Sequence, residues 1–136
     1  MEDISIKKLD ELKLMYIEAE TFPDGIKDSW DKLEKALDTI KERKFYGISK
    51  CIGKNIIYRA CVIPIDDNEP KRLGLETLTI PSNSYATKKL MNWSSQIPMF
   101  GTIFDELFSK HNTNKDLYAL EYYKSADEAI LMVPLL

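Results

Sequence analysis

FYGIS at residues 45–49 and LYALE at residues 117–121 are similar five-residue segments, and each is followed by a second matched segment. These second segments are CVIPI at residues 61–65 and LMVPL at residues 131–135. The separation between the tyrosine and the proline is nearly the same in both copies, which indicates an internal duplication. Two copies with so long a period do not make a solenoid. The sequence therefore predicts a fold built from two similar halves.

Each half contains one helical pattern between extended segments. From Ile26 onward, apolar residues recur at steps of three and four, which predicts a helix that begins after an Asp24 N-cap and carries Trp30, Leu33, Leu37 and Ile40 on its apolar face. A second helix is predicted for residues 95–110, with an apolar set of Ile97, Phe100, Ile103, Phe104 and Leu107. Period-two alternation or short apolar runs predict strands at 4–9, 12–19, 44–51, 55–65, 75–80, 85–90, 117–123 and 129–135.

This order predicts an α+β fold of two βαββ repeats related by a pseudo-twofold axis. We expect an antiparallel sheet with two helices that flank a central groove, where small-molecule pockets commonly form. We also expect residues 1–136 to make one domain, since 136 residues is an ordinary domain length.

Composition excludes several functional classes. The net charge of -3 and the scattered lysines and arginines argue against direct nucleic-acid binding, and clusters such as residues 41–44 are expected to be solvated. Cys51, Cys61 and the single His111 do not form a metal-ligand pattern, so we expect no metal and no cofactor. Neither a signal peptide nor a membrane-length apolar run is visible, which predicts a cytoplasmic protein without a membrane partner.

Several short motifs in a fixed order resemble a known family. They are YG at 46–47, YRACV at 58–62, IP at 80–81 before SYA, IP at 97–98 before a helix, EYY at 121–123 and ILMVPL at 130–135. This order is similar to that of the GyrI-like domain, the effector-binding domain of bacterial transcription activators, which is distantly related to the SOUL haem-binding fold. The similarity extends over nearly the whole chain. Regulators of the family also carry a helix-turn-helix, for which this chain has no room, so direct DNA binding is not expected.

The resemblance implies a ligand pocket between the two halves, with Glu121 at its floor and Tyr123 beside it. In family regulators that respond to many drugs, this glutamate pairs with lipophilic cations. Other members of the family hydrolyse reactive cyclopropane-containing toxins, or are proposed to bind DNA gyrase.

The residues around Glu121 support a similar site on physical grounds. Glu121 and Tyr123 are two apart in a predicted strand, so both side chains lie on one face of the sheet. A carboxylate on an inward face needs compensation, either from a cationic ligand among aromatic rings or from protonation. The alternative is that this face is wet and Glu121 is an ordinary surface residue. Besides Glu121 and Tyr123, the predicted ligand-binding residues are Tyr58, Trp93 and Phe100.

Two functions follow from the same residue pair, and binding is favoured over catalysis. The first is a stand-alone protein that binds or sequesters a small hydrophobic or cationic molecule. The second is a hydrolase of strained electrophiles, in which Glu121 is the acid or base and Tyr123 assists it. A protein-binding role is a third possibility, for which the sequence gives no specific support. Trp30 is interpreted as core packing in the first helix.

Overall fold

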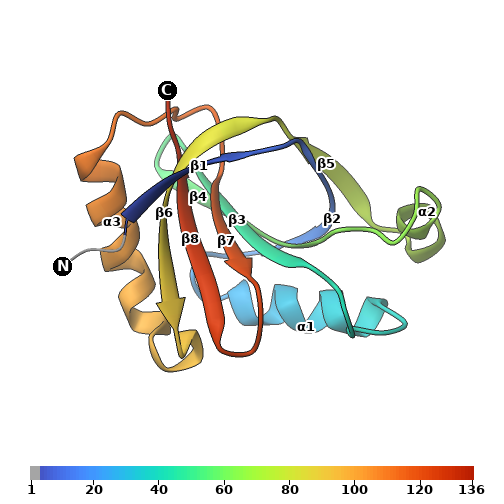
Figure 1. The fold of residues 1–136 in the computed structure, drawn as a ribbon. Helices are drawn as coiled ribbons and strands as arrows, with labels where there is room; N and C mark the ends of the chain where they lie inside the picture. The colour runs from blue at the N-terminus through green and yellow to red at the C-terminus, as the bar shows by residue number, and fades with distance from the viewer. Residues whose placement is uncertain (1–3) are drawn as a thin grey trace.

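The computed structural model describes residues 4–136. Within that range the chain forms eight strands and three α-helices (Figure 1). The strands are β1 (Ile4–Leu9), β2 (Leu12–Glu18), β3 (Phe45–Ile52), β4 (Asn55–Val62), β5 (Glu76–Ile80), β6 (Asn83–Met91), β7 (Ala119–Tyr123) and β8 (Glu128–Pro134). The helices are α1 (Ile26–Ala36), α2 (Glu69–Leu73) and α3 (Phe100–Lys110), and two 3₁₀ turns (Trp93–Ser95 and Ile97–Met99) precede α3.

All eight strands of the described residues belong to one antiparallel sheet, in the order β1-β6-β8-β7-β3-β4-β2-β5. The predicted duplication is visible in this order, because β6-β8-β7 on one side mirrors β2-β4-β3 on the other. The centre of the sheet is the β3–β7 ladder, and its middle pair is Gly47 with Glu121. The pseudo-twofold axis therefore passes between these two residues, and Tyr46 corresponds to Leu120. The similarity in sequence had instead aligned Tyr46 with Tyr118, which is two residues out of register.

The two halves exchange their first strands. β1 pairs with β6 of the second half, and β5 pairs with β2 of the first half. The last pair of β1 with β6 is Leu9↔Asn83, and the first pair of β2 with β5 is Leu12↔Ile80, so the two ladders follow each other in the same register. Where they meet, Ser82 Oγ donates a hydrogen bond of 3.0 Å to the Leu9 carbonyl. Because each half supplies an outer strand to the other, the sheet curls and its two ends arch over one face (Figure 1).

The curled sheet has an apolar layer on each face, as strand alternation requires. Leu14, Tyr46, Leu120 and Met132 lie in the cluster beneath the arch, whereas their chain neighbours Met15 and Leu131 face the helices. On the helix face, Leu33 and Leu37 pack over β2 and β4, and Ile103 and Leu107 of α3 pack over β8. The helix face therefore has two separate apolar clusters, with the β3–β7 centre between them.

The helix boundaries differ from the sequence predictions. α1 begins after Gly25, without a side-chain cap from Asp24, because the chain turns tightly at residues 21–25. It ends at Ala36, and Leu37 turns back into extended conformation to bury its side chain, which leaves Ile40 exposed. α3 begins at Phe100 and not at Ser95, since the preceding turn containing Pro98 is 3₁₀ in form.

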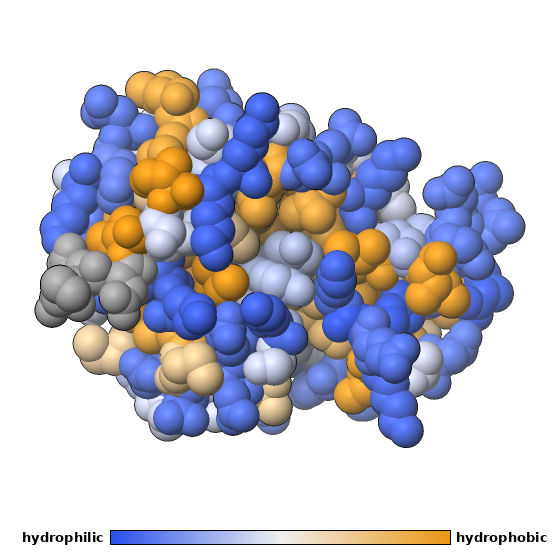
Figure 2. Space-filling view, in the orientation of Figure 1, coloured by the Kyte–Doolittle hydropathy of each residue, from blue (hydrophilic) through white to orange (hydrophobic). Residues whose placement is uncertain are grey.

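Residues 66–73 contain the short helix α2, whose Glu69 forms a buried ion pair with Arg43. Asp66 Oδ1 accepts hydrogen bonds from the backbone N–H groups of Asn68 and Glu69. The Glu69 side chain is 1% exposed, and its carboxylate accepts hydrogen bonds from Arg43 and from the Ile65 backbone. Arg43 belongs to the basic cluster that was expected to be solvated, and that expectation was wrong for this residue. Hydrophilic side chains nevertheless cover much of the face that Figure 2 shows, with hydrophobic patches between them.

Tyr85 lies in the layer beneath the arch and provides a test of the packing. Its side chain is fully buried, and within residues 4–136 its hydroxyl has no hydrogen-bond partner. Burial raises the pKa of this phenol to about 12. Because an unsatisfied buried hydroxyl costs stability, we expect Tyr85→Phe to leave the free energy of unfolding unchanged or to raise it by about 1 kcal/mol. Urea denaturation measures the difference, and a loss of more than about 1 kcal/mol would contradict the assignment.

Candidate functional site

Glu121 lies on the helix face of the sheet, between the two apolar clusters. Both tyrosine hydroxyls that reach it donate to the same carboxylate oxygen: Tyr58 to Oε1 at 2.8 Å and Tyr123 to Oε1 at 2.7 Å. Tyr58 comes from β4 and Tyr123 from β7, so the site assembles strands of both halves. Glu121 is half-buried and is therefore not the ordinary surface residue that was considered as the alternative.

Gly47 makes room for this arrangement. It lies directly opposite Glu121 in the ladder, where a Cβ atom would collide with the Tyr58 hydroxyl and with Glu121 Oε1. Glycine is unfavourable inside a strand, so its presence in β3 needs a packing reason. The reason here is clearance for a carboxylate and a phenol that share the space above it.

Trp30 of α1 completes the hydrogen-bonded chain. Its indole N–H donates to the Tyr58 oxygen at 3.0 Å, and its ring lies edge-on to Tyr123 with centroids 5.6 Å apart. Since the Tyr58 oxygen accepts from Trp30, its own proton is directed at Glu121. The sequence had suggested only core packing for Trp30. In the structure it also orients Tyr58, which donates a hydrogen bond to Glu121.

Further aromatic rings surround the two tyrosines. Trp93 lies against Tyr123 with ring centroids 4.8 Å apart, Phe22 lies 6.3 Å from Tyr58, and Phe45 lies 6.0 Å from Trp30. These three rings come from three separate segments of the chain, which the fold brings to one place. The groups that hold the carboxylate are thus themselves packed among aromatic rings.

No Lys or Arg side chain among the described residues forms an ion pair with Glu121. Nor does any group of residues 4–136 donate a hydrogen bond to its second oxygen, Oε2. The contrast with Glu69 is informative, because that more deeply buried carboxylate has Arg43 as its counter-ion. Within the described part of the chain, the hydrogen bonds to Glu121 therefore all go to one oxygen, and no cationic side chain balances its charge.

This environment shifts the titration of all three groups. Burial raises the pKa of Glu121 above its ordinary value, and the hydrogen bonds from Tyr123 and Tyr58 oppose that rise only partly. Burial and the adjacent Glu121 carboxylate raise the pKa of Tyr58 and of Tyr123 well above 10, so both remain neutral donors. A cation placed near Oε2 would stabilise the ionised form of Glu121 and reverse the upward shift.

Of the five residues predicted to bind ligand, the structure brings four together. Glu121, Tyr58 and Tyr123 are joined by hydrogen bonds, and Trp93 contacts Tyr123. Phe100 is 8% exposed and lies in the apolar cluster under α3; Trp93 and Tyr123 pack against the same cluster, although no aromatic pair joins Phe100 to either tyrosine among the described residues. That any of the five binds a ligand stays a prediction.

Sequence reasoning did not identify Trp30 or Gly47 as site residues. The apolar stripe of α1 gave Trp30 an adequate explanation as core. Gly47 stands inside a predicted strand, and that position was the one signal that could have indicated close approach of other groups.

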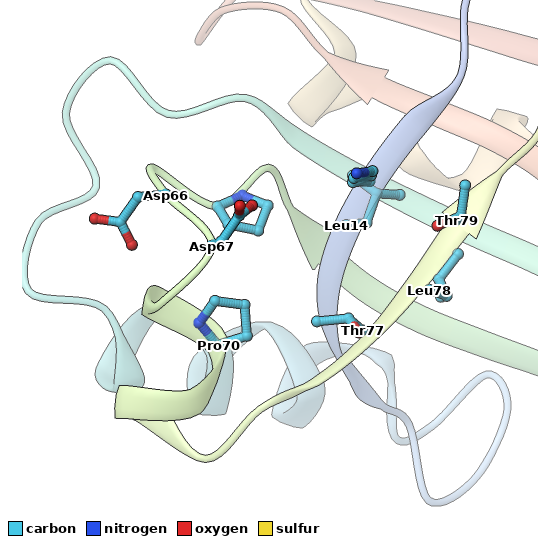
Figure 3. Close-up of a pocket in the computed structure, with 9 residues that line it drawn as sticks. Leu14, Asp66, Asp67, Pro70, Thr77, Leu78 and Thr79 are labelled. Carbon is cyan, nitrogen blue, oxygen red and sulfur yellow. The ribbon is translucent and has the colours of Figure 1, made fainter.

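Two cavities lie elsewhere, where β2 and β5 pass the loop before α2. One, of about 190 Å³, is lined by Leu14, Pro70 and Thr77 among others, and Asp66 and Asp67 stand at its side (Figure 3). The other, of about 440 Å³, adjoins it and shares Asp67, Pro70 and Thr77. Neither reaches Glu121, and the central groove between the two halves stays a prediction. The described residues contain no cluster of three or more metal-ligating His, Cys, Asp or Glu side chains. None of their helices has the length and apolar character needed to cross a membrane.

The fold defines a class of α+β domain in which two similar halves exchange their first strands, and in this chain a half-buried glutamate lies where the halves meet. Residues 2–133 match the model of the GyrI-like small molecule binding domain. The chain belongs to that family.

Solved structures share the fold at low sequence identity. An integron cassette protein from the mobile metagenome of Vibrio cholerae is 16% identical, with 98% of this chain and 95% of that one covered and a TM-score of 0.76. SAV2435 bound to tetraphenylphosphonium is 11% identical, with coverage of 98% and 94% and a TM-score of 0.70. A hydrolase from Listeria innocua is 8% identical, with coverage of 99% and 92% and a TM-score of 0.59. No protein of curated function matches the sequence.

Gly47→Ala tests the clearance around Glu121. The new methyl group would push Tyr58 away from Oε1, so we expect a loss of about 1–3 kcal/mol in the free energy of unfolding. Urea denaturation measures it. Gly101→Ala is the matched control, because a Cβ at Gly101 in α3 meets open space and alanine is the better helix former by about 1 kcal/mol. If Gly47→Ala were as stable as the wild type, the crowding argument would be wrong.

Proposed function

We propose that this protein binds hydrophobic cationic small molecules, with Glu121 as the anionic partner and the surrounding aromatic rings as the apolar walls. The observation that carries the proposal is the half-buried Glu121 carboxylate, to which residues 4–136 supply neither a counter-ion nor a hydrogen bond at Oε2. Burying such a charge is unfavourable unless a cation or a proton compensates it. A lipophilic cation supplies the charge and also buries apolar surface.

The arrangement of the donors favours a cation over a neutral guest. Two phenol protons on Oε1 hold the carboxylate in one orientation and leave Oε2 as the acceptor site. Cation–π attraction to Trp and Tyr rings adds about 0.5–2 kcal/mol per contact. The tetraphenylphosphonium in SAV2435, a protein with the same fold, is a ligand of this chemical class, and that supports the choice of probe.

Tetraphenylphosphonium binding by Glu121→Gln tests the proposal by calorimetry. We expect the wild type to bind, and the variant to bind on the order of tenfold or more weakly, because an amide keeps the shape of the side chain but removes its charge. We also expect the wild-type affinity to fall on acidification. The pKa of Glu121 is raised, so protonation removes the attraction at a higher pH than for an ordinary glutamate, and the variant loses this dependence.

Glu34→Gln is the control, since it changes net charge equally from an exposed position on α1. The neutral triphenylphosphine oxide should bind the wild type and Glu121→Gln alike. If the wild type did not bind tetraphenylphosphonium, or if Glu121→Gln bound it as tightly as the wild type, the proposal would be wrong.

The raised pKa of Glu121 also favours a second candidate, hydrolysis of a strained electrophile. A protonated Glu121 would give its proton to the ring carbon or oxygen that leaves, while water attacks the neighbouring carbon and the ring opens with net addition of one water. Incubation with a cyclopropane- or epoxide-containing compound should then yield a product heavier by one water, and none with Glu121→Gln. An unchanged substrate at high enzyme concentration would remove this candidate.

A further inference from the structure

Two segments occupy equivalent places in the two halves and cover the site from opposite sides. Residues 19–25 link β2 to α1, and residues 92–99 link β6 to α3. Each lays one aromatic ring on one of the tyrosines that hold Glu121. Phe22 lies on Tyr58 and Trp93 lies on Tyr123.

The Trp93 segment is fastened to the body of the protein. The Trp93 indole N–H donates to the Ser125 carbonyl at 3.0 Å, and the Asn92 N–H donates to the Asp127 carbonyl at 2.6 Å. Both acceptors belong to the turn between β7 and β8, next to the strand that carries Glu121. Trp93 also packs against the apolar cluster under α3.

The Phe22 segment is held more weakly. Phe22 is 42% exposed, and its ring is farther from Tyr58, at 6.3 Å between centroids, than Trp93 is from Tyr123. Hydrogen bonds at the segment's far end are internal, from the Gly25 N–H to Thr21 and from the Ile26 N–H to Pro23. Its ties to the rest of the molecule are the Ala19 N–H bond to the Tyr58 carbonyl at 2.8 Å and an exposed Glu20–Lys32 ion pair at 3.7 Å. Exposed ion pairs of this kind contribute little.

The geometry points to Phe22 as the gate through which a ligand reaches Glu121, with Trp93 as a fixed wall. This inference rests on the proposed function, and it adds the route of entry. Trp30, Tyr58 and Tyr123 pack together around Glu121, and a bulky aromatic cation beside its carboxylate needs the space next to these tyrosines that Phe22 and Trp93 take up. Movement of Phe22 breaks no hydrogen bond of its side chain, whereas movement of Trp93 breaks one to Ser125.

The first test needs no ligand. Trp30 and Trp93 are the two tryptophans of the chain, so Trp93→Phe leaves Trp30 as the reporter of access to the site. In that background we expect Phe22→Ala to raise the acrylamide quenching constant of Trp30 at least twofold. Phe108→Ala is the matched control, because Phe108 is 41% exposed on α3, and it should leave the constant unchanged. Quenching that is unaffected by Phe22→Ala would overturn the gate, whatever the protein binds.

The second test measures association of tetraphenylphosphonium by stopped-flow fluorescence. Phe22→Ala in the otherwise natural chain should raise the association and dissociation rate constants severalfold together, so that the affinity changes less. Trp93→Ala should mainly raise the dissociation rate constant. An association rate constant unchanged by Phe22→Ala, or raised more by Trp93→Ala, would refute the assignment. Absence of binding by the wild type would instead refute the proposed function, while the quenching result judges the gate.

Discussion

The carboxylate of Glu121 is half-buried without an ion-pair partner among residues 4–136, and the centre of the molecule is arranged around that constraint. Glycine at position 47 leaves the space above the ladder open. Tyr58 and Tyr123 replace lost water at one oxygen, and Trp30 fixes the direction in which Tyr58 donates. Each of these groups limits the cost of the buried acid, but hydrogen bonds from neutral groups do not substitute for a counter-ion.

Two acidic residues of this chain are compensated in different ways. Glu69 is more buried and is neutralised by Arg43, and it ties the α2 segment to the strand ends. Glu121 has neutral donors on one oxygen, and no group of residues 4–136 donates a hydrogen bond to the other. Burial therefore raises the pKa of Glu121, because neutral donors compensate its charge only partly.

The duplication places the site at the junction of the two halves. The halves differ there in sequence, and this difference determines which side chains the site contains. The pseudo-twofold axis passes between Gly47 and Glu121, so two equivalent positions hold the smallest residue and a carboxylate. Exchange of β1 and β5 between the halves holds this junction closed, since each half's outer strand belongs to the other's sheet. The two segments at equivalent places in the halves, residues 19–25 and 92–99, also differ. The second is anchored by the hydrogen bond of Trp93 to Ser125, whereas the first leaves Phe22 exposed.

The sequence by itself determined the α+β class, the two repeats and the same-face placement of Glu121 and Tyr123, because strand and helix periodicities are local properties of the chain. Local patterns could not place the end of α1 at Ala36, since the extended Leu37 is set by packing against β2 and β4. They could not separate Trp30 from ordinary core or give Phe100 its buried position. Those outcomes depend on which segments meet across the sheet. The junction of Trp30, Gly47, Tyr58 and Glu121 brings together residues up to 91 positions apart, and only the tertiary structure decides such contacts.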